Sequence, residues 1–133
     1  MGRDLVKEYE KYAEKMGVSE WDDRRTFAEF FLSLDKVKGM TNAELIRNSD
    51  LEKSYFYQIM KGQRVPSRDK TIRLCLGAGL TLDEASQALI LNENASLYLK
   101  KRRDRILSFA LEKGLSVTEA KLLLDEEGES PLS

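Results

Sequence analysis

A short phrase recurs along this chain and predicts where helices end and begin. It consists of a glycine, an apolar residue, a serine or threonine, and an acidic residue three positions after the hydroxyl residue. Glycine readily ends a helix, the hydroxyl caps the next helix, and the acid reaches back to the backbone N–H of the cap. Copies stand at residues 17–22, 39–44, 79–84 and 114–119. The phrase therefore predicts a series of helices joined by short links.

The spacing of the apolar residues is also helical, and no sustained alternation predicts a strand. One stripe consists of Leu5, Tyr9, Tyr12 and Met16, and another of Phe27, Phe30, Phe31 and Leu34. We expect an all-α fold with helices over residues 3–16, 20–35, 42–48, 52–61, 68–78, 82–91, 100–113 and 117–126.

The last two helix pairs repeat in sequence at an offset of 35 residues. Arg68-Asp69 matches Arg103-Asp104, and Gly79-Leu80 matches Gly114-Leu115. We interpret this as duplication of a helical hairpin inside one domain; convergence of two hairpins that need the same caps is the alternative. Between the repeats we expect a turn-like segment, residues 92–99, which Tyr98 and Leu99 pin to the core. Residues 126–133 are acidic and are expected to form a loose tail.

Composition excludes several kinds of chemistry. The 133 residues include no histidine and one cysteine, Cys75, so neither a disulfide within the chain, nor a Cys/His zinc site, nor a histidine base is available. No glycine-rich phosphate loop is present either. We therefore expect a protein that is not an enzyme, with no cofactor or metal, and with Cys75 buried. No apolar run approaches the ~20 residues of a membrane span, and we expect a cytoplasmic protein.

The stretch from Thr41 to Gln63 has the form of a helix-turn-helix. The first helix starts at Thr41 and ends near Asn48, three residues turn the chain, and the second helix runs over 52–61 to Gly62. Asp50 in the turn is expected to take a positive φ. The chain has a net charge of −1, but residues 36–73 contain nine basic and four acidic side chains, a net charge of +5. Positive charge therefore concentrates on this motif.

The motif resembles the XRE-type helix-turn-helix family, which has the lambda-repressor-like DNA-binding fold. The resemblance is carried by T-x-x-E-L from Thr41, an apolar Leu51 in the turn, I-x-x-G-x-x-x-P-S from Ile59, and G-L-T-L-D-E-A from Gly79. It covers about residues 24–90. It implies a domain over 23–91, with residues 1–22 as an N-terminal helical extension and 92–133 as a C-terminal hairpin on the same core.

In that family the start of the second helix reads bases, while the first helix and the link after the second contact phosphates. Carried over by position, the resemblance implies base contacts from Lys53, Ser54, Tyr57 and Gln58. It implies phosphate contacts from Thr41, Asn42, Lys61, Gln63 and Arg64. A glutamine can pair with adenine through two hydrogen bonds, and a lysine can donate to guanine. The sequence departs from the family pattern at Asn42, Ile46, Asp50 and Glu52.

Two functions remain open. One is a DNA-binding transcriptional regulator, acting as a homodimer, with the 52–61 helix in the major groove of double-stranded DNA. The alternative is a protein–protein interaction module on the same fold without DNA binding, using Tyr55 and Tyr57 or the C-terminal hairpin. Phe56 between these tyrosines is expected in the core. A second basic cluster, Lys100 to Arg105, is either a solvated helix start or a contact with nucleic acid or an acidic partner.

Overall fold

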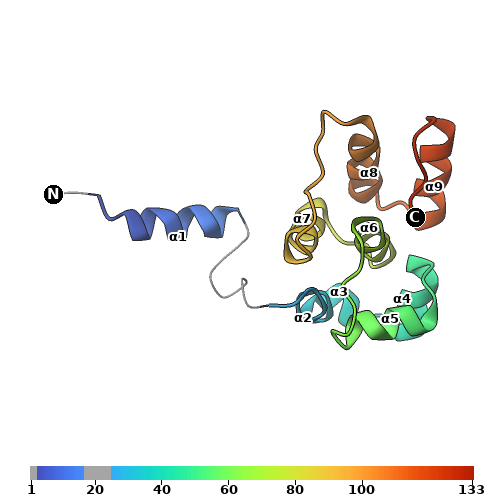
Figure 1. The fold of residues 1–133 in the computed structure, drawn as a ribbon, viewed down its shortest axis with the longest axis horizontal. Coiled ribbons are helices and arrows are strands. Elements are labelled where there is room, and N and C mark those ends of the chain that lie inside the picture. The colour runs from blue at the N-terminus through green and yellow to red at the C-terminus, as the bar shows by residue number, and fades with distance from the viewer. Residues whose placement is uncertain (1–2, 17–24) are drawn as a thin grey trace.

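The computed structural model describes residues 3–16 and 25–133, and every regular element in them is a helix (Figure 1). This confirms the all-α prediction. The helices are α1 (Leu5–Lys15), α2 (Phe27–Ser33), α3 (Asp35–Lys38), α4 (Asn42–Ser49), α5 (Lys53–Met60), α6 (Arg68–Gly77), α7 (Leu82–Leu91), α8 (Arg102–Lys113) and α9 (Val117–Glu126). Within the described ranges, none of these helices combines the length and the apolar character needed to cross a membrane.

In the three copies of the capping phrase that the structure describes, the hydroxyl caps the next helix as predicted, but the acid reaches back to the cap in only two of them. Thr41, Thr81 and Ser116 each accept a hydrogen bond from the backbone N–H three residues later. At Thr81 and Ser116 the glutamate also accepts from the N–H of the cap, which completes a capping box. The glycines before these two boxes have φ near +68°, a conformation that glycine adopts without strain. The first copy of the phrase, at 17–22, lies outside the described residues.

The single helix expected over residues 20–35 is wrong where the structure describes it. Thr26 caps α2 by accepting from the Glu29 N–H, so this helix begins at Phe27. It ends at Ser33, and Leu34 is extended, with φ −73° and ψ 132°. A separate turn, α3, follows. Threonine is a favoured N-cap residue, so Thr26 could have indicated this helix start in the sequence. The prediction relied on the apolar stripe and did not use Thr26.

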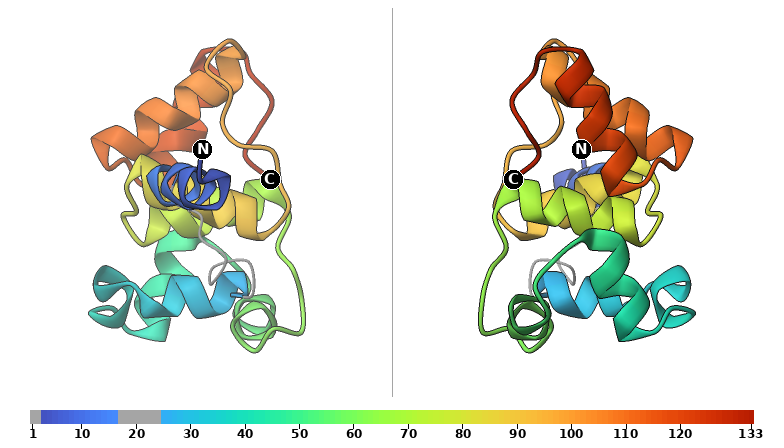
Figure 2. Two further views of the ribbon diagram at one scale, coloured as in Figure 1. Left: turned by 90° about the vertical axis from the view of Figure 1, so that its left-hand side faces the viewer. Right: turned by 90° about the vertical axis from the view of Figure 1, so that its right-hand side faces the viewer.

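Helix α6 forms the centre of the core. Six consecutive residues, 71–76, are buried in it, and it packs against α4, α7, α8 and α9. Figures 1 and 2 show it between the α2–α5 group and the α8–α9 hairpin. Its last residue, Gly77, is a point of close approach, because a Cβ there would lie 2.7 Å from the backbone nitrogen of Ser49 on α4. One continuous apolar cluster joins residues from both parts of the chain, including Phe31, Phe56, Leu107 and Leu124.

Two expectations about the C-terminal part are wrong. Tyr98 and Leu99 do not enter the core, since they are 53% and 58% exposed. Their segment is held by polar contacts instead: Arg68 donates to the carbonyls of Ala95 and Ser96, and the Tyr98 N–H donates to Asp104. The end of the chain is not loose either. Leu132 is 2% exposed, so the last residues contribute to the core.

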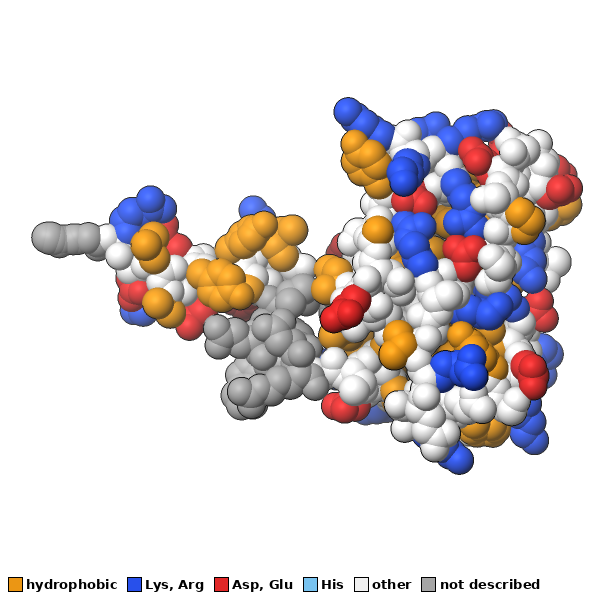
Figure 3. Space-filling view, in the orientation of Figure 1, with side chains coloured by type: hydrophobic (Ala, Val, Ile, Leu, Met, Phe, Trp, Pro, Cys, Tyr) orange, Lys and Arg blue, Asp and Glu red, His pale blue; other side chains and the backbone are white. Residues whose placement is uncertain are grey.

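Helix α1 differs from all the others because none of its residues is buried. Asp4 caps it by accepting from the Lys7 N–H. Figure 1 shows it apart from the remaining helices, and Figure 3 shows hydrophobic side chains on its surface. Residues 5–15 of the expected N-terminal extension are therefore helical, with their apolar stripe exposed, and residues 17–22 lie outside the described residues.

Candidate nucleic-acid interface

Hydrogen bonds from helix α6 hold the turn between α4 and α5. Asp50, with φ 55° and ψ 44°, lies in the left-handed region, as predicted. The Arg73 Nε of α6 donates to the Ser49 carbonyl at 3.1 Å, and its second terminal nitrogen donates to the Asp50 carbonyl. These carbonyls belong to the end of α4, where no helical partner exists. Arg73 therefore serves as a buried cap that sets the direction in which α5 leaves the turn.

Helix α5 buries one side and exposes the other. Phe56 and Ile59 are 0% and 1% exposed, which confirms Phe56 as a core residue. Leu45 of α4 and Leu51 of the turn are also buried against this side. Since two anchors and a pinned turn fix the rotation of α5 about its axis, the orientation of its remaining side chains is determined.

The remaining side chains of α5 and its C-cap include five of the residues singled out from the sequence. At about 100° per residue, they fall within an arc of about 140° opposite Phe56 and Ile59. They are Lys53, Ser54, Tyr57, Gln58 and Lys61. The two lysines and Ser54 are exposed, and Tyr57 and Gln58 are half-buried. We call this set the α5 face.

Arg64 is brought against the α5 face by the link that follows α5. Its Nε donates to the side-chain oxygen of Gln58 at 3.0 Å, and its guanidinium carbon lies 5.2 Å from the centre of the Tyr55 ring. Gly62, with φ +73°, allows the chain to turn back, and the Gln63 N–H donates to the Gln58 carbonyl at 2.8 Å. The amide nitrogen of Gln58 makes no hydrogen bond within the described residues, so it can act as a donor. Arg64 and Tyr55 thus extend the α5 face at its C-terminal end.

Thr41 and Asn42 occupy the start of α4 rather than the α5 face. The Thr41 hydroxyl accepts from the Glu44 N–H, and both residues are exposed. Within the described residues, no side-chain hydrogen bond or ion pair joins either of them to α5. The structure therefore groups seven of the nine singled-out residues around α5 and leaves these two at the opposite end of α4.

Glu52 places a negative charge at the start of α5. It accepts from the Ser54 hydroxyl at 2.7 Å and is exposed. A carboxylate there repels phosphate, although it can accept from the amino group of cytosine. The hydroxyl of Ser54 is therefore already engaged.

Some of the basic side chains in residues 36–73 form ion pairs within the fold, and others are exposed without such a partner. Lys36, Arg68 and Arg73 form ion pairs with Glu84, Asp104 and Asp50, respectively. In the described part of the chain, Lys53 and Lys61 have no ion-pair partner, and Arg64 bonds only to neutral groups. The cations that can meet a polyanion at the α5 face are therefore Lys53, Lys61 and Arg64.

The second basic cluster is largely structural. Arg102 pairs with Glu127, Arg103 pairs with Asp69, and Arg105 donates to the Leu99 carbonyl. Lys100 and Lys101 are exposed. Sequence alone could not assign these roles, because the partners of Arg102 and Arg103 lie 25 and 34 residues away.

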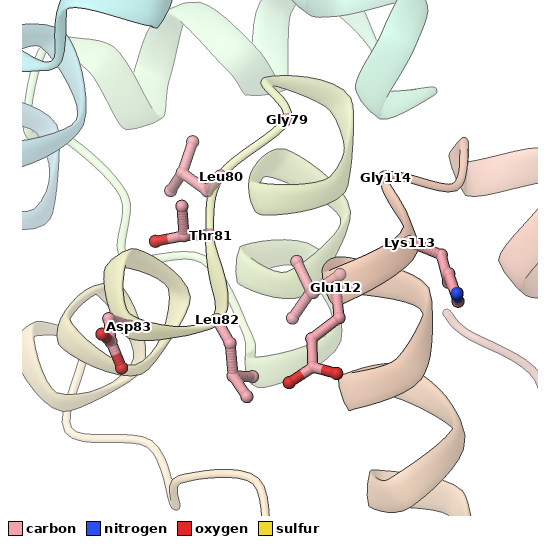
Figure 4. A pocket seen from close by; sticks show the side chains of 9 residues that line it. Gly79, Leu80, Thr81, Leu82, Asp83, Glu112, Lys113 and Gly114 are labelled. Carbon is pink, nitrogen blue, oxygen red and sulfur yellow. The ribbon is translucent and has the colours of Figure 1, made fainter.

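A hollow lies elsewhere, between the two equivalent links of the repeated hairpins. It has a volume of about 590 Å³ and is lined by residues 79–83 and 111–114 (Figure 4). Leu82 and Glu112 point toward one another there, and Lys113 points away. This hollow is open and brings no nucleophile together with a base. Cys75 lies outside it and is fully buried, which raises the pKa of its thiol to about 12.

Arg73 is the functional-site residue that sequence reasoning missed. It stands in an apolar run of α6, where an arginine is costly unless its charge and donors are satisfied. That position was the available signal.

Comparisons with models of known protein families, with curated proteins and with solved structures found no match.

Proposed function

We propose that this chain is a DNA-binding transcriptional regulator with a lambda-repressor-like, XRE-type helix-turn-helix, and that α5 enters the major groove. The observation that carries the proposal is the α5 face: five polar or aromatic side chains share one outward arc, while Phe56 and Ile59 anchor the opposite side. An α-helix fits the major groove of B-form DNA, where the base edges can be distinguished.

In this proposal the polar members of the face divide between bases and backbone. The Gln58 amide nitrogen and Lys53 donate to base edges, and Tyr57 offers an aromatic edge to a thymine methyl group. Lys61 and Arg64 neutralise phosphates, and Gln63 donates to backbone oxygens. Arg64 also holds Gln58 in place through their hydrogen bond, so the residue that contacts the backbone orients a residue that reads bases.

The free cations set the expected salt dependence. Each neutralised phosphate contributes about −0.9 to the slope of log affinity against log salt concentration. With Lys61 and Arg64 as the cations that neutralise phosphates, the slope for one copy is about −2. A bound dimer doubles that slope.

The test is selection of duplexes from a random or genomic library, followed by affinity measurements between 50 and 300 mM salt. A regulator selects a motif and loses affinity along the expected slope. If no duplex is enriched and binding stays weak at the lowest salt, the proposal is wrong.

The alternative is a protein interaction module. It is favoured by Glu52, whose exposed carboxylate stands at the leading end of α5. The half-buried Tyr55 and Tyr57 would then be interface anchors, a role for which tyrosine is favoured. Failure of duplex selection, together with capture of one specific protein that Tyr57→Ala abolishes, would establish this alternative.

A further inference from the structure

Helix α1 presents an apolar stripe that nothing in the described structure covers. Leu5, Val6, Tyr9, Tyr12 and Met16 are between 53% and 66% exposed. The other positions of the helix are mostly lysine and glutamate, so α1 is strongly amphipathic. An isolated helix of eleven residues is marginal in water and gains its stability from packing such a stripe against a partner.

We propose that α1 pairs in antiparallel orientation with α1 of a second copy of this chain. Leu5, Tyr9, Tyr12 and Met16 are separated by four, three and four residues, which is the spacing of alternating core positions in a coiled coil. This spacing reads the same in both directions. In an antiparallel pair, Leu5 therefore packs on Met16 of the second copy, and Tyr9 packs on Tyr12.

The charges beside the stripe select this orientation. Glu8 and Lys15 stand immediately before Tyr9 and Met16, on the same flank of the stripe. In the antiparallel pair Glu8 faces Lys15 of the second copy, and the two-fold axis makes this contact twice. In a parallel pair Glu8 would face Ala13 and gain nothing. Opposite charges at such flanking positions decide partner and orientation.

The uncharged flank of the stripe allows the two helices to pack closely. On the charged flank, Glu8 is able to contact Lys15 of the second copy. Val6 and Ala13 lie on the uncharged flank. Glu8 is bonded to Arg3 of its own chain, with an N–O distance of 2.6 Å, but both side chains are exposed. Exposed ion pairs contribute little, so Glu8 can exchange Arg3 for Lys15 of the second copy.

The pairing surface of one short helix is small compared with the ~1,200–2,000 Å² of a stable complex. We therefore expect a reversible dimer with a dissociation constant in the micromolar range or higher. This inference does not depend on DNA binding. On a DNA with two half-sites, it would raise the effective concentration of the second copy.

Sedimentation of the full chain over a range of concentrations tests the pairing. Glu8→Lys or Lys15→Glu is expected to weaken the dimer about tenfold, because each change places like charges together twice. An equimolar mixture of the two variants restores dimerisation, since both contacts are then opposite in sign. Glu10→Lys and Lys11→Glu change outward-facing charges of α1 and are the matched controls, for which we expect no change.

Disulfide trapping tests the orientation. Leu5→Cys mixed with Met16→Cys is expected to give a cross-linked heterodimer under mild oxidation, whereas Leu5→Cys alone gives little. The native Cys75 is fully buried and does not contribute. A monomer at all concentrations, a dimer that the charge changes do not affect, or preferential cross-linking of Leu5→Cys to itself would each overturn the proposal.

Discussion

Arg68 and Asp104 form a bidentate ion pair, in which the two terminal guanidinium nitrogens lie 3.1 and 2.9 Å from the two carboxylate oxygens. Arg103 and Asp69 form the same pair in the reverse direction, at 3.2 and 2.9 Å. Each Arg-Asp dipeptide lies in the first turn of the first helix of one repeated hairpin, α6 or α8. The repetition in sequence therefore corresponds to a reciprocal contact in space, where each hairpin supplies the arginine for the aspartate of the other.

Removing one charge of this contact tests how much it stabilises the fold. Asp104 is 5% exposed and accepts from both Arg68 and the Tyr98 N–H. We expect Asp104→Asn to lower the free energy of unfolding by about 2–4 kcal/mol, because Arg68 is left partly buried without a counter-charge. Urea denaturation measures this loss. Asp125→Asn, at an exposed position of α9, is the control and should change stability by less than about 0.5 kcal/mol.

At Gly77 we expect substitution by alanine to lower stability, whereas helix propensity alone would predict an increase. Alanine in a helix is usually more stable than glycine by about 1 kcal/mol. At Gly77 the added Cβ would meet the backbone of α4, so we expect Gly77→Ala to destabilise the protein by about 1–3 kcal/mol. Gly39→Ala is the matched control, because Gly39 has φ −78° and no atom within 3.4 Å of the added carbon. Equal effects of the two changes would contradict the close approach.

The α5 face gives a prediction that separates binding from folding. Lys61→Glu combined with Arg64→Glu is expected to reduce affinity for the selected duplex by at least about 100-fold at 100 mM salt, because two phosphate contacts become repulsive. The thermal midpoint should change by only a few degrees, since both residues are exposed.

The control for that variant carries the same change of net charge at remote exposed lysines, Lys100→Glu with Lys113→Glu. Fluorescence anisotropy with the selected duplex compares the two proteins. Equal losses of affinity would show that net charge, and not the α5 face, determines binding.

Acid is expected to destabilise the fold only at low pH. Among the residues that the structure describes, four carboxyl groups have lowered pKa values: Asp50, Asp69, Glu84 and Asp104. A hydrogen bond from Lys121 and its charge lower the pKa of Asp50. At Asp104 burial acts in the opposite direction, but hydrogen bonds from Arg68 and the Tyr98 N–H outweigh it and lower the pKa.

A carboxyl group with a lowered pKa stabilises the folded state above its unfolded pKa of about 4, and this contribution is lost as the pH falls through the folded value. Because the chain contains no histidine, we expect the free energy of unfolding to vary little between pH 5 and 8. It should then fall steeply below about pH 4. Urea midpoints measured from pH 2 to 8 test this, and a large change between pH 5 and 7 would contradict it.

The local parts of this structure were predictable because their causes are local. Thr41, Thr81 and Ser116 mark helix starts through bonds to residues three positions away. The bounds of α4, α7 and α9 were therefore predicted to within one residue. Asp50 could be assigned a positive φ because the three-residue turn requires it.

The remaining features depend on contacts across the chain. Whether a cation such as Arg102 or Lys53 is paired or free depends on which acid the fold brings beside it. The acidic tail was expected to be loose, yet Ser133 donates to Asp69, 64 residues earlier. Charge counts along the sequence overstate the free positive charge near α5, because they include Arg68 and Arg73, which support the fold.

The ion pair between Lys121 and Asp50 joins residues 71 positions apart, at 3.0 Å. It connects α9 to the same turn that Arg73 holds from α6. Two helices far apart in the sequence therefore bind different groups of Asp50, since Arg73 of α6 binds its carbonyl and Lys121 of α9 binds its carboxylate.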